Sequence, residues 1–463
     1  MRLALLVANR GFFPSSVIDL AYDDMHQAFR KAGVECLSID RNAIKYGAVE
    51  TTQEGFVFAR FLEEHRGEFD GLVICLPNFG DENGIKAAIA GCDVPILIQA
   101  YPDEIGHMDF EHRRDAFCGK FALTSVLTQM GKRYTTFTPF TVHPLSTEFD
   151  TQLQKFAAVC RVVKKMKKIR LGALGARTTA FKSVRYDEVA LERHGIDVES
   201  YDFSYILKAV NKTSESDPAV KDWLEKLHST ADFSNAPVGR DVSIAKLGAV
   251  LDLLARDAAL DVMAIRCWSE LQETLNISPC AVVGLFNQAG IPIACEMDVT
   301  NAIAMLGLAL ASQKSCGCLD WNNNYGNEPD KCILFHCGPL PMELMQGPGV
   351  IEEHKMLSKT YGQGCSWGLN VGKIRTGDIT FAGMRTEAGQ LCFYADKARI
   401  TDDPVEKEFF GVSGVLEMPG LQNKLNNISR NGFRHHVTIT AGDVEETLSE
   451  ALVNYLGYKR INI

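Results

Sequence analysis

The sequence has no long hydrophobic run. Nowhere in its 463 residues do about 18 apolar residues follow one another, the length that a membrane-crossing helix needs. The apolar N-terminus, residues 1–8, is too short for a signal peptide and has no cleavage site, so it is interpreted as a first strand. These absences argue against a membrane or secreted protein, and we expect a cytoplasmic location.

An excess of positive charge is also lacking. The chain has 48 Lys and Arg residues against 58 Asp and Glu residues, and its net charge of −10 argues against nucleic acid as a partner. The 14 cysteines are spread over the whole length and do not form a disulfide framework. Several lie within apolar segments, where cysteine acts as a small buried hydrophobe, namely Cys75, Cys267, Cys295 and Cys332. A reducing compartment is therefore expected.

Nucleotide-binding and zinc motifs are missing as well. The glycine-rich stretch at 172–177 lacks both the G-x-G-x-x-G spacing and the Lys-Ser/Thr pair of a P-loop. Cys316 and Cys318 are not at zinc-knuckle spacing, and no second cysteine pair is placed to complete a site. The lysine-rich stretch at 164–168 is interpreted as a solvated boundary between domains.

A repeated alternation of strand and helix patterns is present. In the first third of the chain, short apolar strand patterns are expected at 3–8, 34–39, 71–76 and 95–100. Amphipathic or capped helices are expected between them, at 16–32, 55–66 and 84–90. A second alternating unit runs from a strand at 169–174 to a helix at 299–312. After about residue 315, alternating runs separated by Gly-rich turns favour antiparallel strands, and a last helix is expected at 444–456.

These patterns predict an α/β fold. Two doubly wound parallel-sheet domains, at 1–165 and 166–312, are followed by a C-terminal, mostly antiparallel β domain at 313–463.

Two carboxylates at the ends of apolar strand patterns, and a double histidine far downstream, are the main candidates for chemistry. Glu296 ends the run at 291–295, and Asp320 follows Cys318-Leu319, while His435 and His436 precede a β-branched run. Strand ends are where α/β sheets place ligand-binding groups, although a single such carboxylate is more often a helix cap or salt-bridge partner. Two carboxylates and an imidazole together suit a divalent ion such as Mn²⁺ that keeps positions open for substrate.

The histidines are not equivalent candidates. Adjacent residues of a strand face opposite sides, so at most one of His435 and His436 can share a site with the carboxylates. His336 lies on an apolar strand pattern and is interpreted as a buried neighbour or an auxiliary ligand.

Three further residues are candidates for contacts to an oxygen-rich substrate such as a sugar. Arg10 follows the first strand and could contact an anion or only cap the sheet edge. Trp321 could stack on a sugar or be a core residue, and Asn322 belongs to the polar run after Asp320.

At these residues the chain resembles the family of L-fucose and L-arabinose isomerases. The matching stretches are Pro-Ile-Ala-Cys-Glu-Met-Asp-Val at 292–299, Leu-Asp-Trp-Asn at 319–322, His-Cys-Gly at 336–338 and Arg-His-His-Val at 434–437. The resemblance implies that Glu296, Asp320 and His436 bind Mn²⁺ or another divalent metal. It also implies a homo-oligomer, usually a hexamer, in which the N-terminal domain of a neighbouring subunit completes each site.

The chain also departs from the family pattern. It is shorter than a typical fucose isomerase, and the segment between Asp320 and His436 is reduced accordingly. Asn9-Arg10-Gly11 stands where the family usually has Arg-Pro-Thr. Asp320 matches the fucose type, because arabinose isomerases carry Glu there. These differences leave the sugar open.

The residues and the resemblance together predict a Mn²⁺-dependent aldose–ketose isomerase that acts on a monosaccharide through a cis-enediol. Glu296 and Asp320 would be the acid–base pair, one removing the C2 proton and the other delivering a proton to C1. His336 and His435 are further candidates for substrate contacts. The sugar could be of the fucose or arabinose type, or a sulfonated sugar such as sulfoquinovose. Alternatives are a metal-dependent sugar aldolase or hydrolase and a non-catalytic sugar-binding protein.

Overall fold

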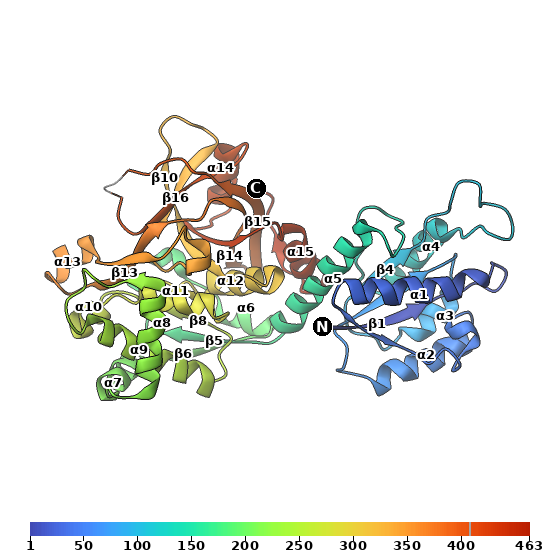
Figure 1. Ribbon diagram of the computed structural model, residues 1–463, viewed down its shortest axis with the longest axis horizontal. Coiled ribbons are helices and arrows are strands. Elements are labelled where there is room, and N and C mark those ends of the chain that lie inside the picture. The colour runs from blue at the N-terminus through green and yellow to red at the C-terminus, as the bar shows by residue number, and fades with distance from the viewer. Residues whose placement is uncertain (407–408) are drawn as a thin grey trace. The chain divides into compact units, whose positions relative to one another are not determined.

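Figure 1 shows the protein as a computed structural model, which describes residues 1–406 and 409–463. Their contacts divide the chain into two compact units, 1–164 with 450–455 and 165–449 with 456–463. The predicted fold class is confirmed: two four-stranded parallel sheets with helices are followed by a ten-stranded, mostly antiparallel sheet. The segments predicted as second and third domains lie together in the second unit, apart from a few C-terminal residues.

The first unit is built on a parallel sheet of order β2-β1-β3-β4. Its elements are β1 (Arg2–Val7), α1 (Ser16–Lys31), β2 (Glu35–Ser38), η1 (Lys45–Gly47), α2 (Thr52–Glu64), β3 (Gly71–Leu76), α3 (Glu82–Ala88), β4 (Ile96–Ala100), α4 (Ala116–Gln129) and α5 (Thr147–Met166). Every residue of β3 and β4 is buried, as expected for parallel strands covered on both faces. Helices α4 and α5 were not predicted from the sequence.

A capping box fixes the start of α2. The Thr51 hydroxyl accepts the backbone N–H of Glu54, and the Glu54 carboxylate accepts the backbone N–H of Thr51. The helix therefore begins three residues before the predicted start at 55, where apolar periodicity alone had placed it.

A short C-terminal segment also belongs to the first unit. The π-helix η4 (Glu450–Tyr455) is held there by the Tyr455 hydroxyl, which lies 2.8 Å from the Thr135 hydroxyl and donates to the Ile96 carbonyl at 3.3 Å. Thr135 in turn donates to the Glu450 carboxylate at 2.7 Å. The helix predicted at 444–456 is thus divided between α15 (Glu445–Ser449) in the second unit and η4 in the first.

The second unit contains a parallel sheet of order β6-β5-β8-β9. Its strands are β5 (Ile169–Leu174), β6 (Ile196–Tyr201), β8 (Val262–Ile265) and β9 (Ile293–Ala294). The helical elements around it are η2 (Lys182–Val184), α6 (Glu188–Arg193), α7 (Phe203–Lys212), α8 (Pro218–Thr230), α9 (Arg240–Asp257), α10 (Glu270–Leu275), α11 (Cys280–Gln288) and α12 (Val299–Ser312).

The ten-stranded sheet of the same unit has the order β18-β15-β14-β17-β10-β11-β16-β13-β12-β7. Its strands are β7 (Ala231–Asp232), β10 (Cys316–Asn324), β11 (Lys331–His336), β12 (Gly349–Glu353), β13 (Trp367–Lys373), β14 (Gly377–Glu387), β15 (Gln390–Ile400), β16 (Val412–Glu417), β17 (His436–Ala441) and β18 (Lys459–Arg460). The helical elements along it are η3 (Met342–Leu344), α13 (Lys355–Tyr361) and α14 (Leu421–Arg430).

Helix α12 joins the two sheets of the second unit. It contacts β8 and β9 of the parallel sheet and β10, β14 and β17 of the ten-stranded sheet. The helix is buried almost all round, which is typical of a helix between two layers. The Asp298 carboxylate caps its N-terminus by accepting the N–H of Asn301. The residues that follow β9 are therefore held beside β17.

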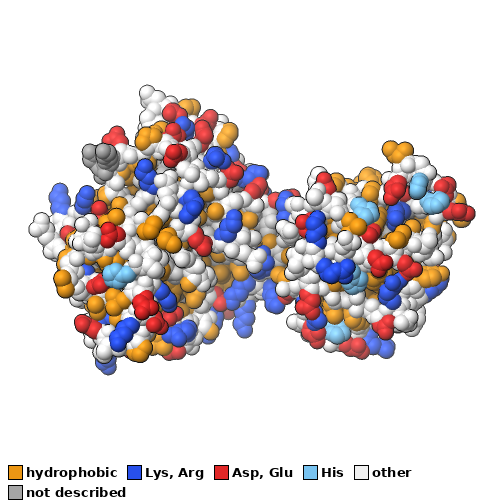
Figure 2. All heavy atoms as spheres, viewed as in Figure 1, with side chains coloured by type: hydrophobic (Ala, Val, Ile, Leu, Met, Phe, Trp, Pro, Cys, Tyr) orange, Lys and Arg blue, Asp and Glu red, His pale blue; other side chains and the backbone are white. Residues whose placement is uncertain are grey.

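Charged side chains on the surface are mixed in sign. On the face in Figure 2, acidic and basic groups are interspersed over both units. Among the described residues, no helix is long and apolar enough to cross a membrane.

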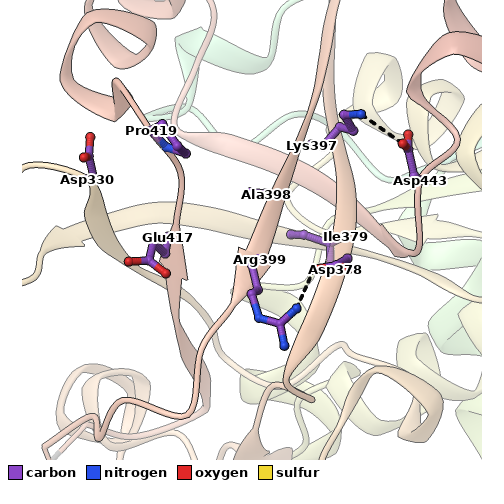
Figure 3. A pocket seen from close by; sticks show the side chains of 9 residues that line it. All are labelled: Asp330, Asp378, Ile379, Lys397, Ala398, Arg399, Glu417, Pro419 and Asp443. Atoms are coloured by element: carbon purple, nitrogen blue, oxygen red, sulfur yellow. Dashed lines mark hydrogen bonds and ion pairs between the residues drawn. The ribbon is translucent and has the colours of Figure 1, made fainter.

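A hollow of about 460 Å³ on the ten-stranded sheet is lined mainly by charged side chains (Figure 3). Lys397 pairs with Asp443 at 3.0 Å, and Arg399 pairs with Asp378 at 2.7 Å across β14 and β15. All four side chains are more than half exposed, so each pair contributes at most about 1 kcal/mol to stability.

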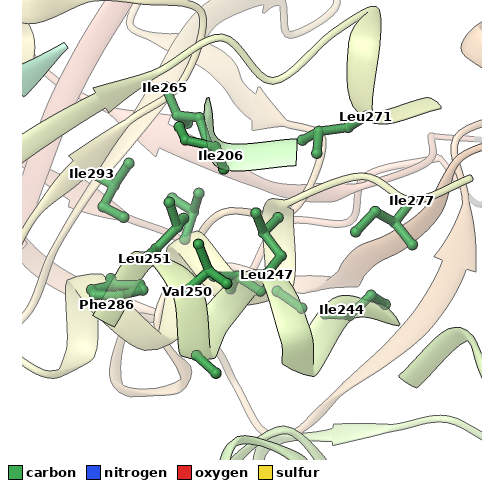
Figure 4. Packing of buried hydrophobic residues seen from close by; sticks show 14 of the residues in the cluster. Ile206, Ile244, Leu247, Val250, Leu251, Ile265, Leu271, Ile277, Phe286 and Ile293 are labelled. Atoms are coloured by element: carbon green, nitrogen blue, oxygen red, sulfur yellow. The ribbon is translucent and has the colours of Figure 1, made fainter. Parts of the chain in front are cut away.

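The core of the parallel sheet in the second unit offers a stability test. Leu251 on α9 is fully buried in the cluster with Ile265, Phe286 and Ile293 (Figure 4). Leu251→Ala leaves a cavity there, and we expect it to lower the free energy of unfolding by about 2–5 kcal/mol in chemical denaturation. Leu253, on the same helix, is 53% exposed, so Leu253→Ala should change it by about 0.5 kcal/mol or less. Equal effects of the two changes would contradict this packing.

Candidate active site

A cavity of about 350 Å³ lies in the second unit and is lined by five of the predicted site residues. These are Glu296, Asp320, Asn322, His336 and His435. Its wall also carries the aromatic side chains of Phe181, Trp268 and Phe335 and the thiols of Cys267, Cys280, Cys295 and Cys337. This volume accommodates a small ligand such as a monosaccharide.

Strand pairing brings Asp320 and His436 together. They are directly opposite in the antiparallel register of β10 and β17, so their side chains lie on the same face of the sheet. His436 Nε2 is 3.7 Å from Asp320 Oδ1. The expectation that Asp320 ends a strand is wrong, because β10 continues through a bulge after Trp321 and ends at Asn324.

A strained turn directs Glu296 toward the same place. Strand β9 ends at Ala294, and both Glu296 (φ 60°) and Met297 (φ 62°) adopt left-handed backbone conformations. Such conformations cost on the order of 1 kcal/mol or more for residues other than glycine, and they gather at functional sites. The Trp268 indole N–H donates to Glu296 Oε1 at 3.3 Å and holds the carboxylate.

His436 lies between two carboxylates and is fully buried. Its Nδ1 is 2.8 Å from Asp298 Oδ2, and its Nε2 is 2.9 Å from Glu296 Oε2. Burial lowers the pKa of His436, but the hydrogen bonds to the two carboxylates outweigh it and raise this pKa to about 10. Burial raises the pKa of Glu296, yet the His436 hydrogen bond lowers it to about 2.

Asp298 and Arg434 hold His436 from its Nδ1 side, and neither was singled out as a candidate site residue from the sequence. The Asp298 side chain is fully buried and pairs with the Arg434 guanidinium at 2.6 Å. Burial raises the pKa of Asp298, but Arg434 and His436 lower it to about 2. Arg434 also donates to Thr300 Oγ1 at 2.9 Å and to the Met384 carbonyl at 3.1 Å. With a carboxylate on Nδ1, the other ring nitrogen, Nε2, faces Glu296 and Asp320, which is the usual arrangement behind a metal-binding histidine.

The donor atoms fit a divalent cation. Possible ligand atoms within 4.8 Å of one another form two overlapping groups, Glu296 with His336 and His436, and Asp320 with His435 and His436. Asp320 Oδ1 is buried and has no hydrogen-bond partner among the described residues. A buried carboxylate oxygen without a partner is costly, and a cation would satisfy it. Carboxylate and imidazole donors suit Mn²⁺ and similar ions.

Two other predicted residues lie at the mouth of this cluster. His435 is 43% exposed and lies 3.9 Å from Asp320 Oδ1. Burial and the neighbouring His436 lower the pKa of His435. Asn322 is exposed and lines the cavity.

Trp321 and Arg10 lie elsewhere. Trp321 packs edge-on against Phe381 and donates to the Tyr394 hydroxyl at 3.3 Å, within the core of the ten-stranded sheet. Arg10 belongs to the first unit, where it donates to the Gly80 carbonyl at 2.9 Å and lies over the Phe79 ring.

His354 and Cys337 also line the cavity, and no sequence pattern had indicated His354. His354 is 5% exposed, and its Nε2 lies 3.2 Å from Cys337 Sγ. Burial lowers the pKa of His354 to about 4. Cys337 stands in the His-Cys-Gly stretch, where only His336 had been singled out.

The pKa of His354 predicts a pH dependence of stability. The unfolded chain binds a proton at His354 below its ordinary pKa of about 6.5, whereas the folded chain does so only near 4. The unfolded state thus binds more protons between these values, and acidification through this window should remove stability on the order of 3 kcal/mol. His354→Gln should flatten that fall in urea titrations at stepped pH, whereas His107→Gln, at a 64% exposed side chain, should keep it. An unchanged slope in His354→Gln would contradict the assignment.

Two family models match parts of this chain. Residues 4–167 match the N-terminal domain of fucose/sulfoquinovose isomerase, and residues 334–463 match the C-terminal domain of L-fucose isomerase. Glu296 and Asp320 lie in the stretch between the two matches, whereas His336, His435 and His436 lie within the second.

Three curated relatives are named sulfoquinovose isomerase. Those of Priestia aryabhattai and Priestia megaterium are each 22% identical over 297 residues, 63% of this chain and 64% of the relative. That of Clostridium sp. is 22% identical over 311 residues, 64% of this chain and 65% of the relative. The chain thus spans just under two thirds of the length of these relatives. A family domain is matched at each end, which confirms the resemblance to the L-fucose isomerase family that the sequence motifs had indicated.

Proposed function

We propose that this protein is an aldose–ketose isomerase that acts on a monosaccharide with the help of a divalent metal ion. One observation carries the proposal: two carboxylates that line a cavity of about 350 Å³ lie beside the buried imidazole of His436, and Asp320 Oδ1 has no hydrogen-bond partner among the described residues. The family matches and the names of the three relatives support the same reaction class.

Glu296, Asp320 and His436 are the residues that would hold the cation, and Mn²⁺ is the ion that the family resemblance favours. A bound divalent ion would draw electron density from the carbonyl and hydroxyl oxygens of the sugar and so acidify its C2 proton. Asp298 keeps His436 Nδ1 occupied, and Trp268 restrains Glu296, so both side chains are oriented before a ligand arrives.

The proton transfers belong to the two carboxylates. One of Glu296 and Asp320 removes the proton from C2, which gives the cis-enediol as its enediolate. The other delivers a proton to C1, while the O2 hydroxyl proton passes to O1 to complete the ketose. Phe181, Trp268 and Phe335 line the cavity and would limit water access to the intermediate. Both carboxylates line the cavity, which supports this assignment of roles.

The free cysteines and the family resemblance support our assignments of the cellular compartment and the oligomeric state. All 14 cysteines are free, which supports a reducing compartment, and we assign the protein to the cytoplasm. We assign a hexamer by resemblance to the family.

The substrate is a fucose- or arabinose-type sugar in the first instance, and a sulfonated sugar is the second candidate because of the relatives' names. A sulfonate needs a cationic partner, and neither Lys nor Arg occurs among the described residues that line the cavity. By resemblance to the family, in which the N-terminal domain of a neighbouring subunit completes each site, Arg10 is the cation that we assign to an acidic sugar.

The reaction class can be tested by turnover in D₂O with added Mn²⁺ against fucose, arabinose, xylose, rhamnose, glucose and sulfoquinovose. We expect an interconversion that conserves mass and introduces deuterium at the carbon next to the carbonyl, because the C2 proton passes through an exchangeable carboxylate. Mass spectrometry and NMR of the product provide the readout. A smaller carbonyl product would indicate an aldolase or hydrolase instead.

The metal assignment can be tested without a known substrate. Glu296→Gln and Asp320→Asn should each weaken Mn²⁺ binding about 100-fold or more in calorimetric titration, since loss even of an outer-sphere partner costs about 10–100-fold. Glu273→Gln changes an exposed carboxylate of the same unit and should bind Mn²⁺ as the unaltered protein does. Unchanged affinity in both site variants would show that the cation binds elsewhere.

Charge reversal at Arg10 distinguishes the two substrate candidates. Arg10→Glu should raise KM for a sulfonated sugar about 10-fold or more, since a charged hydrogen bond contributes about 1.5–3 kcal/mol, and should leave KM for a neutral sugar unchanged. Arg133→Glu, at an exposed cation of the same unit, should affect neither. Equal losses on both sugars would count against a role for Arg10 in anion recognition.

A further inference from the structure

Cys337 connects two histidines that line the cavity. Its backbone N–H donates to His336 Nδ1 at 2.8 Å, and its Sγ lies 3.2 Å from His354 Nε2. The proposed proton transfers use none of these three residues.

The hydrogen bonds of His354 define its tautomer. Its Nδ1 accepts the backbone N–H of Leu357 at 3.4 Å and so caps α13. A neutral imidazole carries one proton, which must therefore be on Nε2. Burial lowers the pKa of His354 to about 4, so the ring is neutral near pH 7. Its Nε2–H then donates to Cys337 Sγ.

The same reasoning applies to His336. Because its Nδ1 accepts the N–H of Cys337, Nε2 is the ring nitrogen that carries a proton. Neither nitrogen then keeps a lone pair for a cation, so His336 is unsuited to be a metal ligand despite its closeness to Glu296 and His436. His336 is 3% exposed, lines the cavity, and has no partner for Nε2 among the described residues.

The turn after β11 keeps Cys337 in this position. Gly338 has a φ of 140°, and a Cβ on it would lie 2.5 Å from the backbone nitrogen of Asn370. The backbone of His354 is fixed on the other side, since its N–H donates to the Ser366 carbonyl and its carbonyl accepts the Ser366 hydroxyl. Both ends of the Cys337–His354 contact are therefore held by the backbone.

We propose that His336 is a catalytic residue whose Nε2–H donates to the sugar oxygen that gains negative charge during enediol formation, and that Cys337 and His354 are positioning residues for it. The proposal rests on the proposed isomerase function. As the C2 proton leaves for a carboxylate, its electron pair forms the C1–C2 double bond, and the carbonyl electrons move to O1. A fixed donor at that oxygen stabilises the charge, and such a donor is worth about 100- to 1,000-fold in rate.

The tautomers can be measured directly in the intact protein. Long-range ¹H–¹⁵N spectra of protein labelled with ¹⁵N-histidine, assigned through His336→Gln and His354→Gln, should show both rings protonated at Nε2. A proton on Nδ1 of His336 would overturn the proposal. This result does not depend on turnover, so it stands even if no sugar is converted.

Mn²⁺ affinity distinguishes a role of His336 as a hydrogen-bond donor from a role as a metal ligand. His336→Leu should bind Mn²⁺ within about 3-fold of the unaltered protein, whereas ligand variants such as Glu296→Gln should lose about 100-fold or more. A loss in His336→Leu as large as that in Glu296→Gln would identify His336 as a ligand and overturn the proposal.

Kinetics then test the role in catalysis. His336→Leu should lower kcat about 100-fold or more with a small change in KM. His336→Gln should recover part of the lost kcat, because its side-chain amide can also donate an N–H to the substrate. Cys337→Ala should lower kcat about 10-fold and Cys337→Ser should restore it, because a hydroxyl can also accept from His354.

An unchanged kcat in His336→Leu would remove the catalytic role. Failure of the unaltered protein to turn over any sugar would refute the isomerase function, and with it the catalytic role, while the tautomer assignment would stand or fall on the spectra.

Discussion

The buried carboxylate of Asp298 is the constraint on which the site depends. It is fully shielded from solvent and is shared by Arg434, His436 and the N-terminus of α12. An unpaired charge at that depth would cost several kcal/mol, so the loss of any one partner should destabilise the second unit. These contacts join α12 to the start of β17, and Arg434 adds β14 through Met384. The same carboxylate therefore stabilises the packing between the two sheets and orients the site.

The fold could be predicted from the sequence to a large extent because buried parallel strands and amphipathic helices have distinct periods. Elements such as β3, β5 and α12 have the predicted bounds, since apolar residues and flanking glycines or caps mark both ends. The predicted and observed strand bounds differ where tertiary contacts determine the local structure. Strand β9 is cut to two residues by the left-handed turn at Glu296, and Asp320 stays within a strand because β11 and β17 pair with β10 on either side.

The types of residue in the site could be predicted from the sequence, but most of the contacts between them could not. Glu296, Asp320 and the histidines could be identified as candidates, because acidic and imidazole groups beside apolar strands are unusual. The link from Asp298 to His436 spans 138 residues, and no local pattern in the sequence records it. His354 presents the same difficulty, since its closeness to Cys337 results from the turn at Gly338. The sequence shows which side chains can take part in the site, and the strand register determines which of them lie close together.

The electrostatics of the cluster also link cation binding to proton release. Nε2 of His436 lies 2.9 Å from Glu296 and 3.7 Å from Asp320, and the proton on this imidazole now balances the carboxylates, with a pKa raised to about 10 against the effect of burial. In the proposed metal site, a cation bound at Nε2 would need its lone pair and would take the place of that proton. Asp298, held by Arg434, contacts Nδ1 on the opposite side of the ring and keeps the imidazole aligned.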